Sequence, residues 1–121
     1  MKVRAIEHVQ LAMPKGDEQK ARAFYHDVLD IPEKEKPPEL AKRGGAWFED
    51  GALKIHLGVE ANFRPARKAH PALLVEGIAE LIARLKAAGH PVIEEAMPGY
   101  RRIYTEDPFG NRIELMEKTR S

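Results

Sequence analysis

Four side chains that can bind a metal ion recur at matching places in the two halves of this sequence. His8 and His70 each lie in the first stretch of alternating polar and apolar residues of a half, and His56 and Glu114 each lie in the last. All four stand on the polar side of that alternation, so each points to the same kind of strand face. Three imidazoles and a carboxylate suit Zn, Fe, Mn, Ni or Co, which accept nitrogen and oxygen ligands. The spacing predicts one divalent transition-metal site.

The simpler alternative is that each histidine is a separate surface or packing residue. The repetition of four competent residues on matching strands favours a shared site. If the ion takes five or six ligands, one or two positions remain for water or for a chelating substrate, and these open positions would make the site catalytic. A tetrahedral Zn held by all four residues would leave no open position.

The elements that must position these residues follow from hydrophobic periodicity. Alternation of two predicts strands, spacing of three and four predicts helices, and Asp50-Gly51 is typical of a hairpin turn. Asp17 is a candidate N-cap, and Gly89 ends the second helix. In the first half we expect strands at 3–11, 46–49 and 53–59, a helix from Asp17 to Leu29, and a loop at 32–38. In the second half we expect strands at 70–75, 101–105 and 112–117, a helix at 78–88, and a further strand within 91–95.

The second half therefore repeats the order of the first. We expect one domain over residues 1–121, with a first module at about 3–60, a linker at about 61–69 and a second module at about 70–118. The linker contains Pro65 and three cations, and it is the best internal boundary. This order is an α+β arrangement.

Composition limits the function classes. A chain of 121 residues has the length of one domain, and 43% hydrophobic residues can form a core. Twenty Lys and Arg against nineteen Asp and Glu leave a net charge of +1, which disfavours nucleic acid and anionic membranes as partners. The absence of Cys excludes disulfides and thiolate chemistry. No apolar run approaches the roughly 20 residues of a membrane span, so we expect a soluble, cytoplasmic protein.

Four further residues are candidates for binding a small-molecule substrate. Gln10 lies two residues from His8 on the same strand face, where it could hydrogen-bond a substrate oxygen or orient a ligand. Trp47 and Phe48 cannot face the same side of a strand, so one is expected in the core and the other could line the site, and their order is open; Trp47 is taken as the candidate. Arg102 and Tyr104 could bind an anionic or flat group, although such a cluster is more often a solvated strand face.

Two segments carry a resemblance to a known superfamily. His8-Val9-Gln10-Leu11 opens the first half, and Asp-Pro-Phe-Gly-Asn-Arg-Ile-Glu-Leu at 107–115 closes the second. With the paired order of strand, helix and three strands, the chain resembles the vicinal oxygen chelate superfamily from about residue 5 to 117. That group includes glyoxalase I, fosfomycin-resistance thiol transferases, extradiol dioxygenases and metal-free bleomycin-resistance proteins. The closing motif is typical of the superfamily but of no single activity.

The resemblance implies two tandem βαβββ modules with curved mixed sheets around a U-shaped cleft, and often a homodimer. Metal-using members take ligands from the first and fourth strands of each module, which correspond here to His8, His56, His70 and Glu114. Glyoxalase I enzymes generally have Glu where this chain has His56. The extradiol dioxygenases and fosfomycin enzymes use two His and one Glu, which His8, His70 and Glu114 match.

The resemblance also implies a mechanism. A small oxygenated metabolite would bind the metal through two neighbouring oxygens, and the metal would act as a Lewis acid in a glyoxalase-like lyase or isomerase reaction or a dioxygenase-like one. Glu114 is then the expected general base. The alternative is a metal-free protein of the bleomycin-resistance type that sequesters a flat or cationic molecule, with Trp47, Tyr100 and Tyr104 as stacking surfaces. An aromatic content of 7% argues mildly against it.

Overall fold

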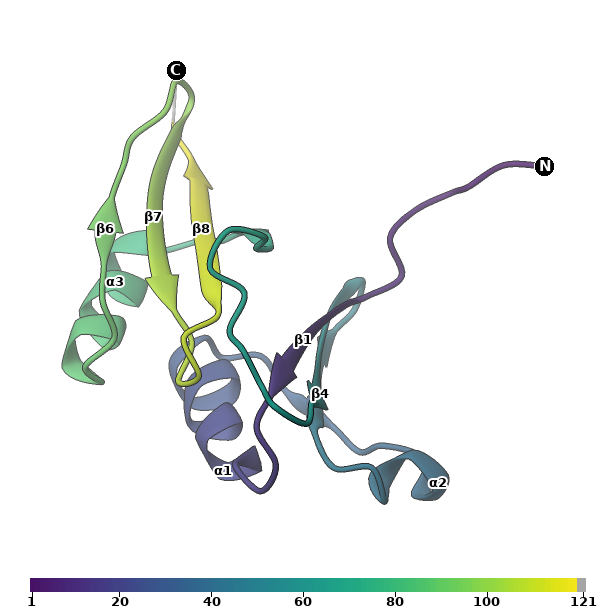
Figure 1. The fold of residues 1–121 in the computed structure, drawn as a ribbon. Helices are drawn as coiled ribbons and strands as arrows, with labels where there is room; N and C mark the ends of the chain where they lie inside the picture. The colour runs from purple at the N-terminus through teal and green to yellow at the C-terminus, as the bar shows by residue number, and fades with distance from the viewer. Residues whose placement is uncertain (120–121) are drawn as a thin grey trace. The chain divides into compact units, whose positions relative to one another are not determined.

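The computed structural model describes residues 1–119 and divides the chain into two compact units, Met1–Arg64 and Pro65–Ser121. Each unit contains one four-stranded mixed sheet with few helices (Figure 1). In both sheets the first strand lies parallel to the last, and the other neighbours are antiparallel. The α+β class and the two tandem βαβββ modules expected from the sequence are confirmed. No helix among the described residues is long and apolar enough to cross a membrane.

The first sheet has the strand order β1-β4-β3-β2. Its strands are β1 (Val9–Met13), β2 (Glu33–Lys34), β3 (Ala46–Asp50) and β4 (Leu53–Val59). Gly51, with a φ of 61°, turns the chain between β3 and β4, as the Asp50-Gly51 pair predicts. On one face of this sheet the buried side chains of Phe48, Ile55 and Leu57 form the core.

One helical segment covers that core face. It begins as α1 (Glu18–Ala21) and continues as a π-helical stretch, η1 (Arg22–Val28). Its apolar residues are buried as their spacing predicts, and Tyr25 stacks on Phe48 with ring centroids 5.4 Å apart. Asp17 precedes the helix, but its side chain makes no capping hydrogen bond. A second short helix, α2 (Pro38–Ala41), lies between β2 and β3.

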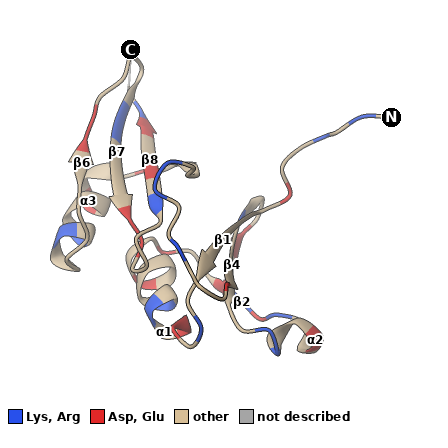
Figure 2. Ribbon diagram, in the orientation of Figure 1, with Lys and Arg blue, Asp and Glu red and all other residues tan. Residues whose placement is uncertain are grey.

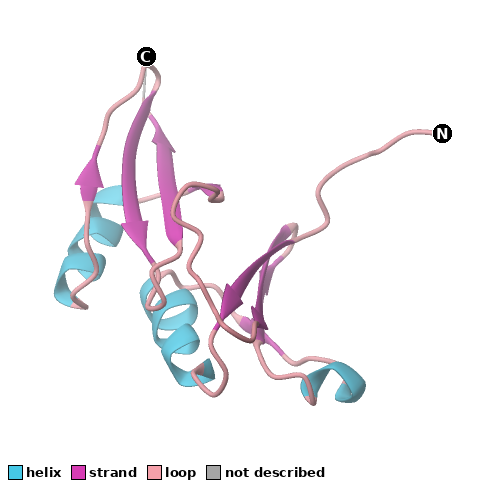
Figure 3. Ribbon diagram, in the orientation of Figure 1, coloured by secondary structure: helices cyan, strands magenta, loops and turns pink. Residues whose placement is uncertain are grey.

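The second sheet has the order β5-β8-β7-β6, with α3 packed against it (Figure 3). The elements are β5 (Ala72–Leu74), α3 (Ile78–Ala87), β6 (Ile93–Glu94), β7 (Tyr100–Glu106) and β8 (Arg112–Lys118). Ile78, Ile82 and Leu85 of α3 are buried, as are Ile113 and Leu115 of β8. The opposite face of β8 therefore carries Arg112, Glu114 and Met116.

A hydrogen-bonded turn joins β7 to β8 and accounts for much of the closing motif. Asp107 accepts hydrogen bonds from the backbone N–H groups of Phe109 and Asn111 and from the Asn111 side-chain amide, all at 2.9 Å. The Asn111 side-chain oxygen accepts from the N–H of Ala66 at 2.9 Å, and the Ala66 carbonyl accepts from the N–H of Arg112 at 2.9 Å. Asp107 and Asn111 therefore position the loop before β5 and the start of β8.

The structure differs from the sequence-based expectation at the first strand, which begins at Val9 and not at residue 3. Val3 is 92% exposed and Ile6 is 80% exposed, and the chain before β1 runs away from its sheet (Figure 1). The physical reason is the length of the partner strand. Val9 lies opposite Ile55, so the parallel register reaches Leu53, the first residue of β4, only two positions earlier.

Two further differences concern short elements. The segment 32–38, expected as a loop, contains β2, and α2 begins at its last residue, Pro38. β2 has two residues and α2 has four, so neither is long enough to produce a detectable periodicity. The further strand expected within 91–95 is present as β6, and β5 begins at Ala72, two residues after His70.

Candidate functional site

The four predicted metal ligands lie as two pairs, one in each unit. His8 contacts His56 in the first unit, and His70 contacts Glu114 in the second. Within residues 1–119, no three His, Asp or Glu side chains lie together as a complete set that could hold an ion. A site that uses all four residues stays a prediction.

In the first unit, three rings stack over the sheet. The ring of His56 lies between those of Trp47 and His8, with centroid distances of 4.2 and 4.3 Å and interplanar angles of 9° and 21°. Trp47 and His56 are direct cross-strand partners on β3 and β4, whereas His8 stands one residue before β1. Because His56 is only 5% exposed and both ring faces are covered, only the ring edge can reach a ligand.

Glu49 is a partner of His56 that the sequence analysis missed. The Nε2 of His56 lies 2.7 Å from Oε2 of Glu49, and Lys34 lies 3.5 Å from the other carboxylate oxygen. The hydrogen bond from His56 lowers the pKa of Glu49 below its ordinary value, and Lys34 adds to this effect against the opposing effect of burial. Since an ionised carboxylate can only accept, Nε2 of His56 donates its proton to Glu49, and Nδ1 lies on the other edge of the ring.

Such a carboxylate behind an imidazole is the usual arrangement that orients a metal-binding histidine. The signal for Glu49 was present in the sequence, because Glu49 shares the strand face of Trp47 two residues away. Phe48, between them, is fully buried in the core, which assigns the other face to Trp47.

Gln10 lies near the same cluster, beside Gly58, which follows His56 by two residues on β4. A Cβ at Gly58 would lie 2.5 Å from the Gln10 side-chain nitrogen, so the Gln10 amide lies across this glycine. Gln10 and Trp47 line one pocket of about 290 Å³, which also has Lys36 and Arg43 on its wall. Two of the predicted substrate-binding residues thus share a cavity.

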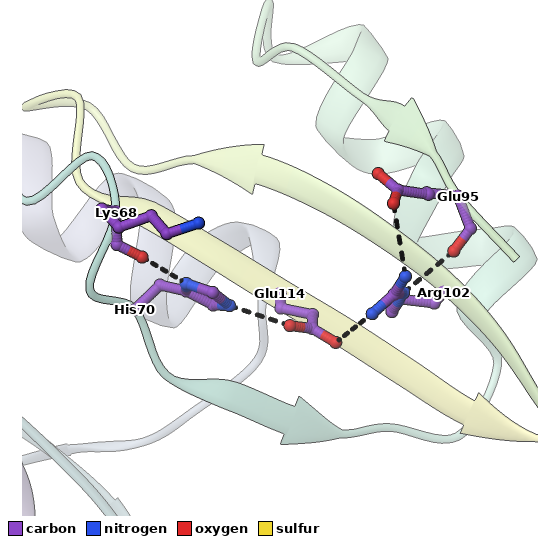
Figure 4. Close-up of polar contacts among 5 residues, drawn as sticks. All are labelled: Lys68, His70, Glu95, Arg102 and Glu114. Carbon is purple, nitrogen blue, oxygen red and sulfur yellow. Dashed lines mark hydrogen bonds and ion pairs between the residues drawn. The ribbon is translucent and has the colours of Figure 1, made fainter. Parts of the chain in front are cut away.

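In the second unit, His70 and Glu114 belong to a continuous polar network (Figure 4). Nδ1 of His70 lies 2.7 Å from the carbonyl oxygen of Lys68, and Nε2 lies 2.8 Å from Oε1 of Glu114. The other Glu114 oxygen lies 3.5 Å from Nη1 of Arg102. Glu114 is only 6% exposed. Its carboxylate lies between the imidazole of His70 and the guanidinium of Arg102.

The contacts of His70 fix its tautomer. A carbonyl oxygen can only accept, so Nδ1 carries a proton, and Nε2 then faces a carboxylate oxygen at 2.8 Å. Two lone pairs at that distance would repel, so either a proton or a bound cation lies between Nε2 and Oε1. The donor chemistry of this pair fits a transition-metal ion.

Pro71 does not disturb this arrangement. It lies before β5, where a missing N–H interrupts no ladder, and its carbonyl accepts the N–H of Glu114 at 3.0 Å. His70 is thereby brought beside Glu114.

Arg102 and Tyr104, the remaining predicted substrate residues, lie on the same sheet face as Glu114. Tyr104 is the cross-strand partner of Glu114, and its ring meets that of His70 edge-on at 5.5 Å. Arg102 donates to the carbonyl of Glu95 at 2.9 Å and lies 3.5 Å from its carboxylate. Its charge is thus shared between Glu95 and Glu114.

Comparison with known proteins places this fold in a family. The family model described as Glyoxalase/Bleomycin resistance protein/Dioxygenase superfamily matches residues 5–115. A crystal structure of a Bacillus anthracis protein assigned to the glyoxalase family is 49% identical, with a TM-score of 0.91 and 98% coverage of both chains. No match is found among curated proteins.

Two more distant structures share the fold. A glyoxalase/dioxygenase from Nostoc punctiforme is 20% identical, with a TM-score of 0.78, and covers 97% of this chain and 92% of its own. The fosfomycin resistance protein FosX from Listeria monocytogenes is also 20% identical, with a TM-score of 0.76 and coverages of 98% and 96%. The family match spans nearly the whole sequence, and the chain belongs to the Glyoxalase/Bleomycin resistance protein/Dioxygenase superfamily.

Proposed function

We propose that this protein is a metal-dependent enzyme that acts on a small oxygenated metabolite bound through two neighbouring oxygens. The reaction would be a glyoxalase-like lyase or isomerase reaction or a dioxygenase-like one. The superfamily includes metal-dependent enzymes and commonly uses divalent metal ions. The observation that carries the proposal is the His70–Glu114 contact at 2.8 Å, in which both imidazole nitrogens face oxygen atoms.

The proposed ligands begin with this pair. The Lys68 carbonyl holds the proton on Nδ1 of His70, which leaves Nε2 free to bind a cation beside Glu114. His8 and His56 remain the predicted ligands from the first unit. Glu49 would orient His56 and present its Nδ1, as a carboxylate behind an imidazole does at many metal sites.

A bound Zn, Fe, Mn, Ni or Co ion would supply Lewis acidity to a chelating substrate. Glu114 would act as the general base, because its buried carboxylate lies at the proposed site and can accept a carbon-bound proton. Arg102, 3.5 Å from Glu114, would hold that carboxylate in place and help to stabilise negative charge that develops on the substrate. Gln10, Trp47 and Tyr104 would contact the substrate.

The proposal includes a homodimer, since superfamily members often dimerise. The exposed Val3 and Ile6 support it, because an extended segment with exposed apolar side chains is suited to pairing with another strand. Light scattering on the wild type and on Val3→Lys/Ile6→Lys tests this point. A monomer in both would contradict it.

Elemental analysis of protein purified without chelators tests the metal. We expect about one ion per chain in the wild type, and loss of that ion in His70→Ala, because the variant lacks a ligand. His26→Ala is the matched control, since His26 is exposed and pairs with Asp27 on η1. The control should retain the ion. His8→Ala and His56→Ala then decide whether the first unit contributes ligands.

The opposite outcome has a clear meaning. No ion in the wild type, and none after anaerobic incubation with Fe, Mn, Ni, Co or Zn, would overturn the proposal in favour of a metal-free binding protein. Once the ion has indicated which reactions to assay, Glu114→Gln with bound metal and full turnover would contradict the general-base role.

A further inference from the structure

We propose that a pocket at one end of the second sheet binds an oxyanion, and that the substrate is therefore a small organic acid carrying a carboxylate or a phosphate-type group. The step from a bound anion to a substrate rests on the proposed function. The pocket itself has a volume of about 310 Å³ and lies within the second unit. Its cationic wall is formed by Arg67 and Arg112, and its apolar wall by Pro91, Ile93 and the ring of Tyr104.

Tyr104 links the pocket to the His70–Glu114 pair. On β7 and β8, Tyr104 lies opposite Glu114, and Glu106 lies opposite Arg112. Alternate residues of a strand share a face, so Arg112, two positions before Glu114, stands on the same face. Tyr104 lines the pocket and also meets the ring of His70. A ligand bound to Arg112 beside Tyr104 would thus lie on the sheet face that carries Glu114.

Arg112 and Arg102 differ in the groups that their guanidiniums contact. The guanidinium of Arg102 is shared between Glu95 and Glu114. The guanidinium of Arg112 lies 4.0 Å from the centroid of the Tyr104 ring, and in residues 1–119 it forms no ion pair. Stacking on a ring orients a guanidinium and leaves its N–H groups free to donate. Basic residues at the start of β8 and along β7 can be followed in Figure 2.

The loop before β5 brings the second cation to the pocket. Ala66 is held at both backbone groups, by the Asn111 side chain and by the N–H of Arg112, so Arg67 follows a fixed position. Arg67 also forms no ion pair within the described part of the chain and lines the pocket. Two guanidiniums face one carboxylate, that of Glu106, which leaves an excess of positive charge. A bidentate oxyanion satisfies such donors.

Calorimetric titration of the metal-free protein tests this site. The probes are inorganic phosphate and benzoate, with benzamide as the uncharged counterpart of benzoate. We expect saturable binding of at least one anion at millimolar concentration and about tenfold weaker binding of benzamide. Stronger phosphate binding would indicate a phosphate-type substrate, and stronger benzoate binding would indicate a carboxylate on a planar group.

Three arginine variants complete the test. Arg112→Gln should weaken anion binding about tenfold, and Arg67→Gln at least about threefold, because each removes one charged donor. Arg84→Gln on the exposed face of α3 is the control and should bind as the wild type does. Arg67 is exposed, so its variant decides the question even if Arg112→Gln folds poorly. Equal binding by all variants, or no saturable binding of either anion, would overturn the proposal.

Failure of this inference is distinguishable from failure of the metal proposal. The titration uses metal-free protein, and the arginine variants should bind metal as the wild type does. Glu114→Gln should not weaken anion binding, since it removes a nearby negative charge. A protein that binds anions but no metal would retain the oxyanion pocket and lose only the proposed reaction.

Discussion

Asn111→Asp offers a sharp test of the turn that positions Arg67 and Arg112. Asn111 is 1% exposed, and its side-chain amide donates to Oδ2 of Asp107 at 2.9 Å. The substitution keeps the shape of the side chain but places a second carboxylate against Asp107. Two unit charges at that distance repel by about 6 kcal/mol at an effective dielectric constant of about 20. The variant can avoid this repulsion by binding a proton.

Proton binding sets an upper limit on the cost and gives it a pH dependence. An ordinary Asp has a pKa of about 3.9, so keeping the introduced carboxyl protonated costs about 4 kcal/mol at pH 7 and about 1.5 kcal/mol at pH 5. The folded variant then binds more protons than the unfolded chain. Its unfolding free energy should therefore fall as the pH rises, by about 1.4 kcal/mol per pH unit.

Urea denaturation between pH 5 and 8 measures this loss, with far-UV circular dichroism reporting both units. Fluorescence of Trp47, the single tryptophan, reports the first unit. Asn62→Asp is the matched control, because Asn62 is exposed and the same change there should cost less than about 0.5 kcal/mol. An unchanged denaturation midpoint for Asn111→Asp, or a loss that does not vary with pH, would refute the reasoning.

Three other substitutions have defined outcomes. Gly45→Ala should lower the unfolding free energy in urea denaturation by about 3 kcal/mol or more, because at a φ of 83° the new Cβ would lie 2.1 Å from the Leu57 carbonyl oxygen. Gly51→Ala, at a φ of 61° but with open space around the new Cβ, should lower it by about 1 kcal/mol. Equal losses would contradict the clash. Thr105→Val should raise the unfolding free energy by about 1 kcal/mol, since within the described residues the buried Thr105 hydroxyl has no hydrogen-bond partner; a less stable variant would indicate an unseen partner. Glu49→Gln should weaken metal binding about tenfold in chelator competition, through the orientation of His56, and unchanged affinity would remove Glu49 from the site.

The longer elements could be predicted because their periodicity is set by burial on one face. β3, β4, β7, β8 and α3 lie within about two residues of their expected bounds, which is the usual uncertainty of element ends. β1 was placed wrongly at its start because residues 3–8 alternate well, but the end of a strand also depends on its partner. β4 begins at Leu53, which the parallel register places opposite Glu7, so residues 3–6 have no partner on β4. The sequence of residues 3–6 does not show this.

Partners of the predicted site residues were harder to find than the residues themselves. Glu49 contacts His56 through the β3–β4 hairpin, where strand parity would have placed both on one face. Arg112 was not identified from the closing motif, because only the structure shows that its guanidinium stacks on Tyr104 while that of Arg102 lies between two carboxylates. Charge pairing depends on rotamers and register, which residue types alone do not define.

In both units the predicted ligands have the same position in the pairing of the first and last strands. Gln10 is the parallel partner of His56, and Ala72 is the parallel partner of Glu114. His8 and His70 each stand two positions before that partner, so each histidine lies beside the key residue of the last strand. The outcome differs because the last strand presents an imidazole in one unit and a carboxylate in the other. His8 therefore stacks on His56, while His70 forms a charged contact with Glu114, and only the second unit combines a nitrogen and an oxygen donor across this register. This difference makes the His70–Glu114 pair the better place to begin the search for a bound ion.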